Sequence, residues 1–222
     1  MVKSFFSSFF PKSNKNTMSK LAFGFTLVEM MVSISIITII TLVVLFDYKN
    51  FNDNLSLSAA QQEISIAIRQ AQIYGISVKE SAGSSCGSNF CSGYGIYFNP
   101  NDPTSYYLFV DKNNNGMYDN DGTGICANNS ECVEKGTLRS GVKINNICGV
   151  PFGGSACPLV AVSGFKSINI TFIRPNPAAV IRFVKSDNSL TNSYQTGQII
   201  FTSLLSKTSK ITIENTGQIS VQ

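Results

Sequence analysis

Hydrophobic residues dominate one long stretch near the start of the chain. Residues 25–46 are almost entirely apolar, and from Met30 to Phe46 the sequence contains no charged side chain. As a helix this stretch would be about 33 Å long, which is enough to cross a bilayer. The pattern therefore predicts a transmembrane helix. It leaves one polar feature to explain, the glutamate Glu29 near the beginning of the run.

A second periodic pattern follows the apolar run. Hydrophobic residues recur at alternating spacings of three and four, with Gln, Glu and Arg between them, at Leu57, Ala60, Ile64, Ala67, Ala71, Tyr74 and Val78. Such a stripe is typical of an amphipathic helix that packs against a sheet. No proline occurs between Phe25 and Asn99. The two patterns together predict a near-continuous helix from Phe25 to about Lys79, roughly 80 Å long and without a proline kink.

The rest of the chain shows the pattern of strands and turns. A Gly- and Ser-rich loop at residues 81–89 ends the helical pattern, and short segments rich in β-branched and aromatic residues follow it. These segments cover residues 94–98, 106–110, 167–173, 178–184, 198–205, 210–214 and 218–222. The sequence therefore predicts an α+β fold, in which a long N-terminal helix, half transmembrane and half amphipathic, packs on a mostly antiparallel β-sheet head.

Charge distinguishes the two sides of the apolar run. Residues 1–24 contain four lysines and no acidic residue, whereas the remainder of the chain carries 13 basic and 13 acidic side chains. Because basic residues are retained on the cytoplasmic side of a membrane, this asymmetry predicts a cytoplasmic N-terminus and a head outside the cytoplasm.

Six cysteines fall as three close pairs in the head. They are Cys86 and Cys91, Cys126 and Cys132, and Cys148 and Cys157. The chain has no histidine, and no pair has the C-x-x-C spacing of a metal site. A disulfide framework outside the cytosol is therefore the favoured interpretation, and free buried thiols are the alternative. Many connectivities are open, although short loops favour pairing within each close pair.

The composition also excludes several enzyme classes. Without histidine, the chain cannot use His-dependent acid–base catalysis, a Ser-His-Asp triad or a His-containing metal site. No candidate nucleophile stands beside a recognisable base, and the acidic residues show no paired spacing. We therefore expect a protein that is not an enzyme.

The stretch GFTLVE at residues 24–29 distinguishes three interpretations of the apolar run. A cleaved signal peptide would be shorter and would end in small residues. An ordinary signal anchor would leave a carboxylate in the membrane without a partner. The stretch instead resembles the type IV prepilin motif. This resemblance implies that a membrane-embedded prepilin peptidase and methyltransferase cuts after Gly24 and methylates the new amine of Phe25. It also implies that Glu29 acts in the assembly of the filament.

The resemblance divides the chain into four parts. Residues 1–24 would be the leader, 25–46 the transmembrane helix, 47–80 its amphipathic continuation and 81–222 the extracytoplasmic β-rich head. This leader is long for the family, and a start at Met18 would give the short leader MSKLAFG. In a filament, the carboxylate of Glu29 would neutralise the N-terminal amine of a neighbouring subunit in a low-dielectric core.

Three further segments extend the resemblance. They are IRQAQIYGISVKESAG at 68–83, YLFVDKNNNGMYDNDG at 107–122 and ITIENTGQISVQ at 211–222. They are similar to the helix end, mid-domain turn and closing strand of minor pilins and pseudopilins of the H-pseudopilin and transformation-pilin type. Major pilins often carry a proline within the mature helix, which this chain lacks. The resemblance therefore favours a minor subunit.

The second of these segments also contains a metal-binding pattern. Residues 111–116 fit the opening of a D-x-[DN]-x-[DN]-G calcium loop. The ligands would come from Asp111, Asn113, Asn115, Met117, Asp119 and Asp121. The twelfth loop position is Gly122, where such loops place a bidentate Glu, and the same letters also favour a solvated hairpin turn. Both interpretations stand, and no cofactor is required elsewhere.

The C-terminal part of the head is mildly basic. From Gly136 onward, eight Lys or Arg stand against two acidic residues. Clustered cations bind a phosphate backbone, so DNA binding is one hypothesis, with Arg174, Arg182 and Lys185 as its candidate residues. A solvated basic face is the simpler explanation of the same residues.

The sequence thus predicts a prepilin that becomes a minor structural subunit of a type IV pilus or a type II secretion pseudopilus. Its partners would be the prepilin peptidase/methyltransferase, other pilin or pseudopilin subunits bound through the N-terminal helix, and the inner-membrane assembly platform. It would begin as a single-pass cytoplasmic membrane protein and end in an extracellular filament. Two alternatives remain, a tip subunit that adheres to a surface or captures DNA, and an uncleaved single-pass anchor protein.

Overall fold

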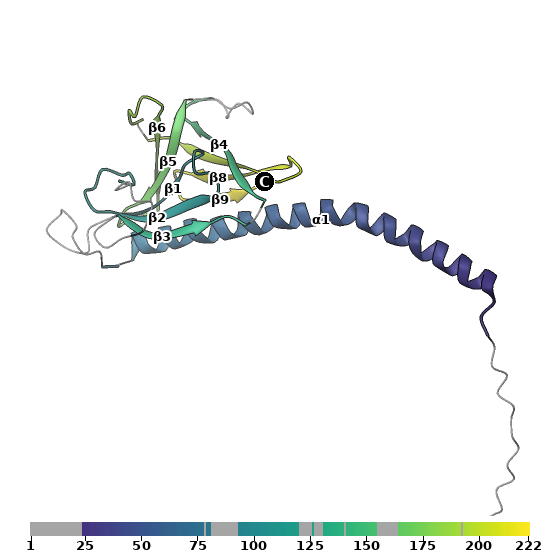
Figure 1. Cartoon of the computed structure of the whole chain (residues 1–222). Helices are drawn as coiled ribbons and strands as arrows, with labels where there is room; N and C mark the ends of the chain where they lie inside the picture. The colour runs from purple at the N-terminus through teal and green to yellow at the C-terminus, as the bar shows by residue number, and fades with distance from the viewer. Residues whose placement is uncertain are drawn as a thin grey trace, which may run out of the picture. The chain divides into compact units, whose positions relative to one another are not determined.

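The computed structural model of the protein describes residues 24–77, 79–80, 93–119, 126, 131–139, 141–154, 164–191 and 193–222. These residues form one α-helix and nine β-strands (Figure 1). The chain divides into two compact units, of which the first ends at Leu45 and the second comprises Phe46–Gln222. The second unit contains all of the strands and the C-terminal part of the helix.

Helix α1 (Leu27–Ile76) is 50 residues long. At its start, the hydroxyl oxygen of Thr26 accepts a hydrogen bond of 3.2 Å from the backbone N–H of Glu29, which is the geometry of an N-terminal cap. No proline or glycine interrupts the helix before Gly75, so the ladder of backbone hydrogen bonds continues. A Cβ atom on Gly75 would collide with the backbone of Phe172, and glycine therefore allows the helix end to approach the strands closely.

Five antiparallel strands form the larger sheet. Their order is β3-β2-β1-β5-β6. Their bounds are β1 (Gly93–Phe98), β2 (Ser105–Asp111), β3 (Cys132–Thr137), β5 (Phe165–Phe172) and β6 (Ala179–Lys185). The central strands β1 and β5 contribute alternating apolar residues, which places one side chain in two on the face that packs against α1.

Four antiparallel strands form the smaller sheet. Their order is β4-β7-β8-β9. Their bounds are β4 (Lys143–Val150), β7 (Thr196–Thr202), β8 (Thr208–Glu214) and β9 (Ile219–Val221). In Figure 1 the strands lie together over the C-terminal part of α1.

The main hydrophobic core joins the helix to both sheets. Its helical contribution consists of Leu57, Ala60, Ile64, Ala67, Ile68 and Ala71. The largest fully buried partners on the strands are phenylalanines, namely Phe98 on β1, Phe172 on β5, Phe183 on β6 and Phe201 on β7. Small residues on the helix and large ones on the sheets let the two surfaces interdigitate closely.

A second, smaller cluster lies on the other face of the larger sheet. Tyr107, Phe109, Tyr118 and Cys132 form it, with Tyr97 and Cys126 packed against them. Because β2 therefore has buried side chains on both faces, all seven of its residues are buried. This explains why the segment around residue 108 reads as a continuous apolar run instead of an alternating one.

The structure confirms the predicted fold class, a long apolar N-terminal helix followed by antiparallel β-sheet. The periodic stripe predicted from Leu57 to Ala71 is buried, and Tyr74 is partly buried. Val78 and residues 81–89 lie outside the described part of the chain.

The structure differs from the prediction in the number of sheets and strands. The head has two sheets, where one was expected, and strands β3 and β4 were not anticipated. Strand β3 is an edge strand with mostly exposed, charged or small residues, so it lacks an apolar alternation. Residues 203–205, expected to continue a strand, form the turn after β7 instead.

Candidate functional site

The residues at the start of α1 are exposed. Phe25 has 76% of its surface accessible, and the side chain of Glu29 is also exposed. A Cβ atom added to Gly24 would meet nothing within 4 Å. The fold described here therefore does not need a glycine at this position, and any requirement for it must come from outside the chain's own packing.

The hydroxyl groups inside the apolar run form hydrogen bonds with the backbone of the helix itself. The hydroxyls of Ser33, Ser35, Thr38 and Thr41 each donate to the backbone carbonyl four residues earlier, at 2.7 to 2.8 Å. This local bonding lets Ser and Thr lie in an apolar environment without a partner from outside. The side chain of Glu29 cannot bond to a backbone carbonyl in this way, because an ionised carboxylate only accepts hydrogen bonds.

Helix α1 contains a candidate membrane span by length and composition. Its most apolar 18-residue window has a mean hydropathy of 2.5 and is not buried by any part of the described structure. The large side chains from Leu27 to Phe46 are exposed throughout. A helix that is apolar on all sides and left uncovered is suited to a lipid or protein surrounding.

Comparison with protein families gives one match at this end of the chain. Residues 20–45 match the prokaryotic N-terminal methylation motif. The chain carries the N-terminal methylation motif of a type IV pilin-like precursor. The motif supports a prepilin-type precursor that is anchored in the membrane, processed by prepilin peptidase and assembled with other pilins as a structural subunit.

The motif match covers residues 20–45 of the chain and does not reach the head. A search of the curated proteins and of the solved structures found no match. The resemblance of the head to H-pseudopilins and transformation pilins is therefore not supported by these comparisons. The assignment of the chain rests on the motif and on the helix that follows it.

A group of polar contacts fastens the head to α1 near the middle of the helix. The hydroxyl of Ser203 donates to the carboxylate of Asp53 at 2.5 Å, and the backbone N–H of Leu205 donates to its other oxygen at 3.4 Å. The ammonium of Lys207 donates to the side-chain oxygen of Asn54 at 2.9 Å. Asp53 is buried. These contacts fix the turn between β7 and β8 on the helix.

A second polar contact fastens the head near the end of the helix. The side-chain amide of Gln72 donates to the carbonyls of Pro177 and Gly217, at 3.1 and 3.4 Å. The amide of Gln61 donates to the carbonyl of Gln222 at 3.1 Å. The C-terminal segment is therefore held against α1 by two buried glutamines.

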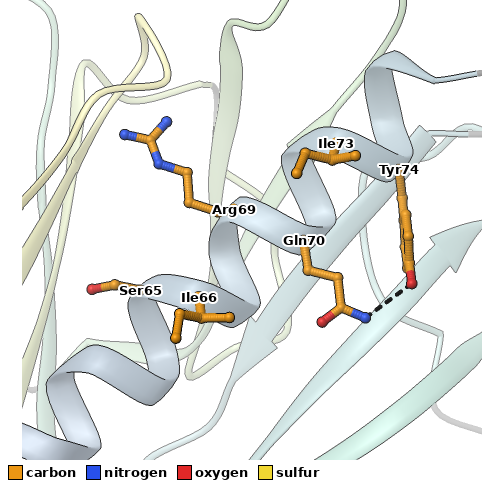
Figure 2. Close-up of a pocket in the computed structure, with 6 residues that line it drawn as sticks. All are labelled: Ser65, Ile66, Arg69, Gln70, Ile73 and Tyr74. Atoms are coloured by element: carbon orange, nitrogen blue, oxygen red, sulfur yellow. Dashed lines mark hydrogen bonds between the residues drawn. The ribbon is translucent and has the colours of Figure 1, made fainter.

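The opposite face of the helix is not covered by the head. Figure 2 shows a shallow groove there, lined by Ser65, Ile66, Arg69, Gln70, Ile73 and Tyr74. Ile66 and Ile73 are 68% and 62% exposed. The amide of Gln70 donates to the hydroxyl of Tyr74 at 3.1 Å, which closes one side of the groove.

The predicted calcium loop forms a turn whose side chains bond to one another. Asp111 is fully buried and accepts hydrogen bonds from the backbone N–H groups of Asn115 and Gly116, at 3.0 and 2.8 Å. The side-chain amides of Asn113 and Asn115 donate to Asp119 at 2.6 and 2.9 Å. Asp111 and Asp119 thus have partners within the turn, and the choice between a calcium loop and a solvated turn, both predicted from the pattern, stays untested.

Glu131 supports this turn from outside the predicted loop. Its two carboxylate oxygens accept from the backbone N–H groups of Lys112 and Asp119, at 2.9 and 2.8 Å. Burial raises the pKa of Glu131 and of Asp111. Met117 follows the turn, and Asp121 lies outside the described residues. No group of three or more acidic or cysteine side chains within the described residues is placed to hold a metal ion.

The cations proposed for DNA binding do not form one cluster. Arg174 lies in the turn after β5, Arg182 in the middle of β6 and Lys185 at the end of that strand. Residues 182 and 185 are separated by an odd number of positions, so they project to opposite faces of the strand. The guanidinium of Arg182 donates to the carbonyl of Asn115 and supports the turn. DNA binding stays a prediction.

The described cysteines are disulfide-bonded. Cys126 pairs with Cys132, as the preference for local pairing predicted. Cys148 is also in a disulfide, and Cys86, Cys91 and Cys157 lie outside the described residues.

Sequence reasoning missed three residues that position the head, namely Asp53, Gln72 and Glu131. All three are buried and polar. Asp53 and Gln72 could have been recognised because they fall next to the apolar stripe, on the face of the helix that becomes buried. Glu131 lies in a segment without periodicity, and no signal in the sequence connects it to the turn at residue 111.

Proposed function

We propose that the chain is a minor structural subunit of a type IV pilus or a type II secretion pseudopilus. In this proposal, prepilin peptidase cuts after Gly24 and methylates Phe25, and the subunit enters a filament through α1. The observation that carries the proposal is the exposed carboxylate of Glu29, which lies within the matched motif and on an otherwise apolar helix.

Electrostatics explains why Glu29 needs another subunit. Within the described residues, no cation of the same chain forms an ion pair with this carboxylate. An unpaired charge in an apolar medium is strongly unfavourable, whereas a charge paired with an amine is tolerated. Cleavage after Gly24 creates such an amine at Phe25. The amine of one subunit and the carboxylate of the next can then neutralise each other.

The uncovered face of α1 provides an apolar surface for the same assembly. In the second unit, Tyr48, Phe51, Leu55, Ile66 and Ile73 are exposed. Ile66 and Ile73 contribute exposed apolar side chains to the groove shown in Figure 2. We propose that the helix of another pilin-like subunit occupies this groove, because apolar helices associate by burying such stripes.

Intact-mass analysis of the membrane or filament fraction tests the proposal. The expected species begins at Phe25 and carries one added methyl group. Substitution Gly24→Val should leave the fold unchanged, because a side chain there meets no other atoms, but should block cleavage. Substitution Glu29→Gln should still be cleaved but should be absent from filaments. Full-length protein from the wild-type chain would overturn the proposal in favour of an uncleaved anchor.

A further inference from the structure

The turn between β7 and β8 exposes two leucines. Leu204 is 77% exposed and Leu205 is 47% exposed, although leucine side chains are usually buried. The turn is nevertheless well fastened. The backbone N–H of Ser203 donates to the carbonyl of Lys207 at 2.9 Å, and Ser203 and Leu205 both donate to Asp53. The fold therefore holds these two apolar side chains in solvent at a defined place.

That place lies close to the end of the apolar run. Asp53 is seven residues after Phe46, so the turn contacts the helix only about 10 Å beyond the last residue of the run. The interfacial layer of a bilayer, between the hydrocarbon and bulk water, is about 5 to 8 Å deep on each side. Lys49 lines the same depression as the two leucines and is only about 5 Å beyond Phe46 along the helix, so this depression reaches the depth of the layer.

The residues around the turn have the composition of a membrane interface. Lys49 lies beside the two leucines in a shallow depression that also includes Asn52 and Asp53. The ammonium of Lys207 bonds to neutral oxygens, the side-chain oxygen of Asn54 and the backbone carbonyl of Asn50, so these partners leave its charge available. Exposed leucines flanked by lysines suit the boundary between acyl chains and anionic headgroups.

Exposed aromatic residues occur at the same level of the helix. Tyr48 and Phe51 are 63% and 66% exposed. Aromatic side chains concentrate at membrane–water interfaces, where the ring lies among the headgroups. The helix and the turn therefore present apolar and basic side chains within the same short distance of Phe46.

We infer that the turn formed by residues 203–207 is a lipid-contact site, in which Leu204 and Leu205 enter the surface of the bilayer and Lys49 and Lys207 bind lipid phosphates. This contact would hold the head at the membrane surface before the subunit is extracted into a filament. The inference rests on membrane insertion of the apolar run, which is also part of the proposed function, but it assigns a second, peripheral contact to the head.

The absence of tryptophan from the chain allows a direct test. Three single-tryptophan variants of the full chain, Leu204→Trp, Val44→Trp and Ile173→Trp, are reconstituted in vesicles of phosphatidylcholine and phosphatidylglycerol that contain brominated phosphatidylcholine as a quencher. The tryptophan of Val44→Trp reports whether the apolar run is inside the bilayer. Ile173 is a matched exposed control, because its neighbour Phe172 lies against Gly75, about 43 Å along the helix from Phe46.

The expected result is quenching of Val44→Trp and Leu204→Trp, with about a twofold loss of fluorescence for Leu204→Trp, and no quenching of Ile173→Trp. Quenching of Leu204→Trp no stronger than that of the control would overturn the inference while the span stands. Absence of quenching for Val44→Trp would overturn membrane insertion itself. Without phosphatidylglycerol, quenching at position 204 should fall, and an unchanged value would overturn the role of the lysines.

Discussion

The hydroxyl of Ser203 donates a hydrogen bond of 2.5 Å to the buried carboxylate of Asp53, across 150 positions of sequence. This pair joins the β7–β8 turn to the first part of α1 that belongs to the head. A carboxylate buried with its hydrogen bonds is stable, but it becomes unfavourable as soon as a donor is lost. The pair therefore determines where the turn sits along the helix.

Removal of the Asp53 carboxylate should destabilise the head. We expect Asp53→Ala to lower the free energy of unfolding by about 2 kcal/mol, because hydrogen bonds to a charged group contribute more than neutral ones. The measurement is thermal or urea unfolding of the full chain in detergent, combined with Ser203→Ala in a double-mutant cycle. The exposed Asp187→Ala is the control and should change stability by less than about 0.5 kcal/mol. Equal effects of the two aspartates would contradict the role of the pair.

Alkaline pH should destabilise the protein through Tyr106. Burial and the nearby Glu63 carboxylate, which accepts a hydrogen bond from the phenol at 3.2 Å, raise the pKa of Tyr106 to about 12. The unfolded chain loses this proton near pH 10, so the unfolded state is favoured increasingly as the pH rises from about 10 to about 12. Below pH 10 the effect is absent.

The expected size of this loss is about 2 to 3 kcal/mol. Urea unfolding as a function of pH measures it. Substitution Tyr106→Phe should reduce the loss without abolishing it, because burial also raises the pKa of Tyr94 and Tyr97, and the exposed Tyr48→Phe should preserve it in full. A parallel decline in the wild type and in Tyr106→Phe would show that another group is responsible.

Gly116 in the DKNNNG turn should tolerate substitution poorly. It has a positive φ of 75°, and an added Cβ would collide with the guanidinium of Arg182. Gly153 has a similar φ of 73° but open space around it. We expect Gly153→Ala to cost about 1 kcal/mol from backbone strain alone, and Gly116→Ala to cost clearly more, because the displaced guanidinium of Arg182 would also lose its hydrogen bond to the carbonyl of Asn115. Unfolding measurements of both variants separate strain from collision, and equal losses would rule out the contact with Arg182.

Calcium should not be needed to hold this turn. Asp111 and Asp119 already accept hydrogen bonds from backbone and side-chain amides, so the turn has internal partners. We expect the Tm to be the same after chelation with EGTA and after addition of calcium. A calcium-dependent rise in Tm that disappears in Asp119→Ala would establish the metal site that the loop pattern suggests.

Features that depend on local periodicity and composition could be predicted from the sequence. The span, the buried stripe from Leu57 to Ala71 and the motif at residues 24–29 could all be recognised because a helix repeats every 3.6 residues and a span needs only length and apolarity. The alternating strands at the centre of the sheet could also be predicted, because the side chains of a strand alternate between its two faces. These features involve neighbours in the chain, so no knowledge of distant contacts is required.

Contacts between residues that are distant in the sequence became known from the folded structure. Strand pairing between segments far apart in sequence divides the strands into two sheets. The same pairing buries Asp53 beneath Ser203 and brings Glu131 to the turn at Asp111. The same holds for Leu204 and Leu205, which continue the apolar pattern of β7 but lie in an exposed turn. Periodicity cannot reveal such placements. A polar residue is buried only where a distant residue supplies its hydrogen bond, and an apolar residue stays exposed only where the turn directs its side chain outward.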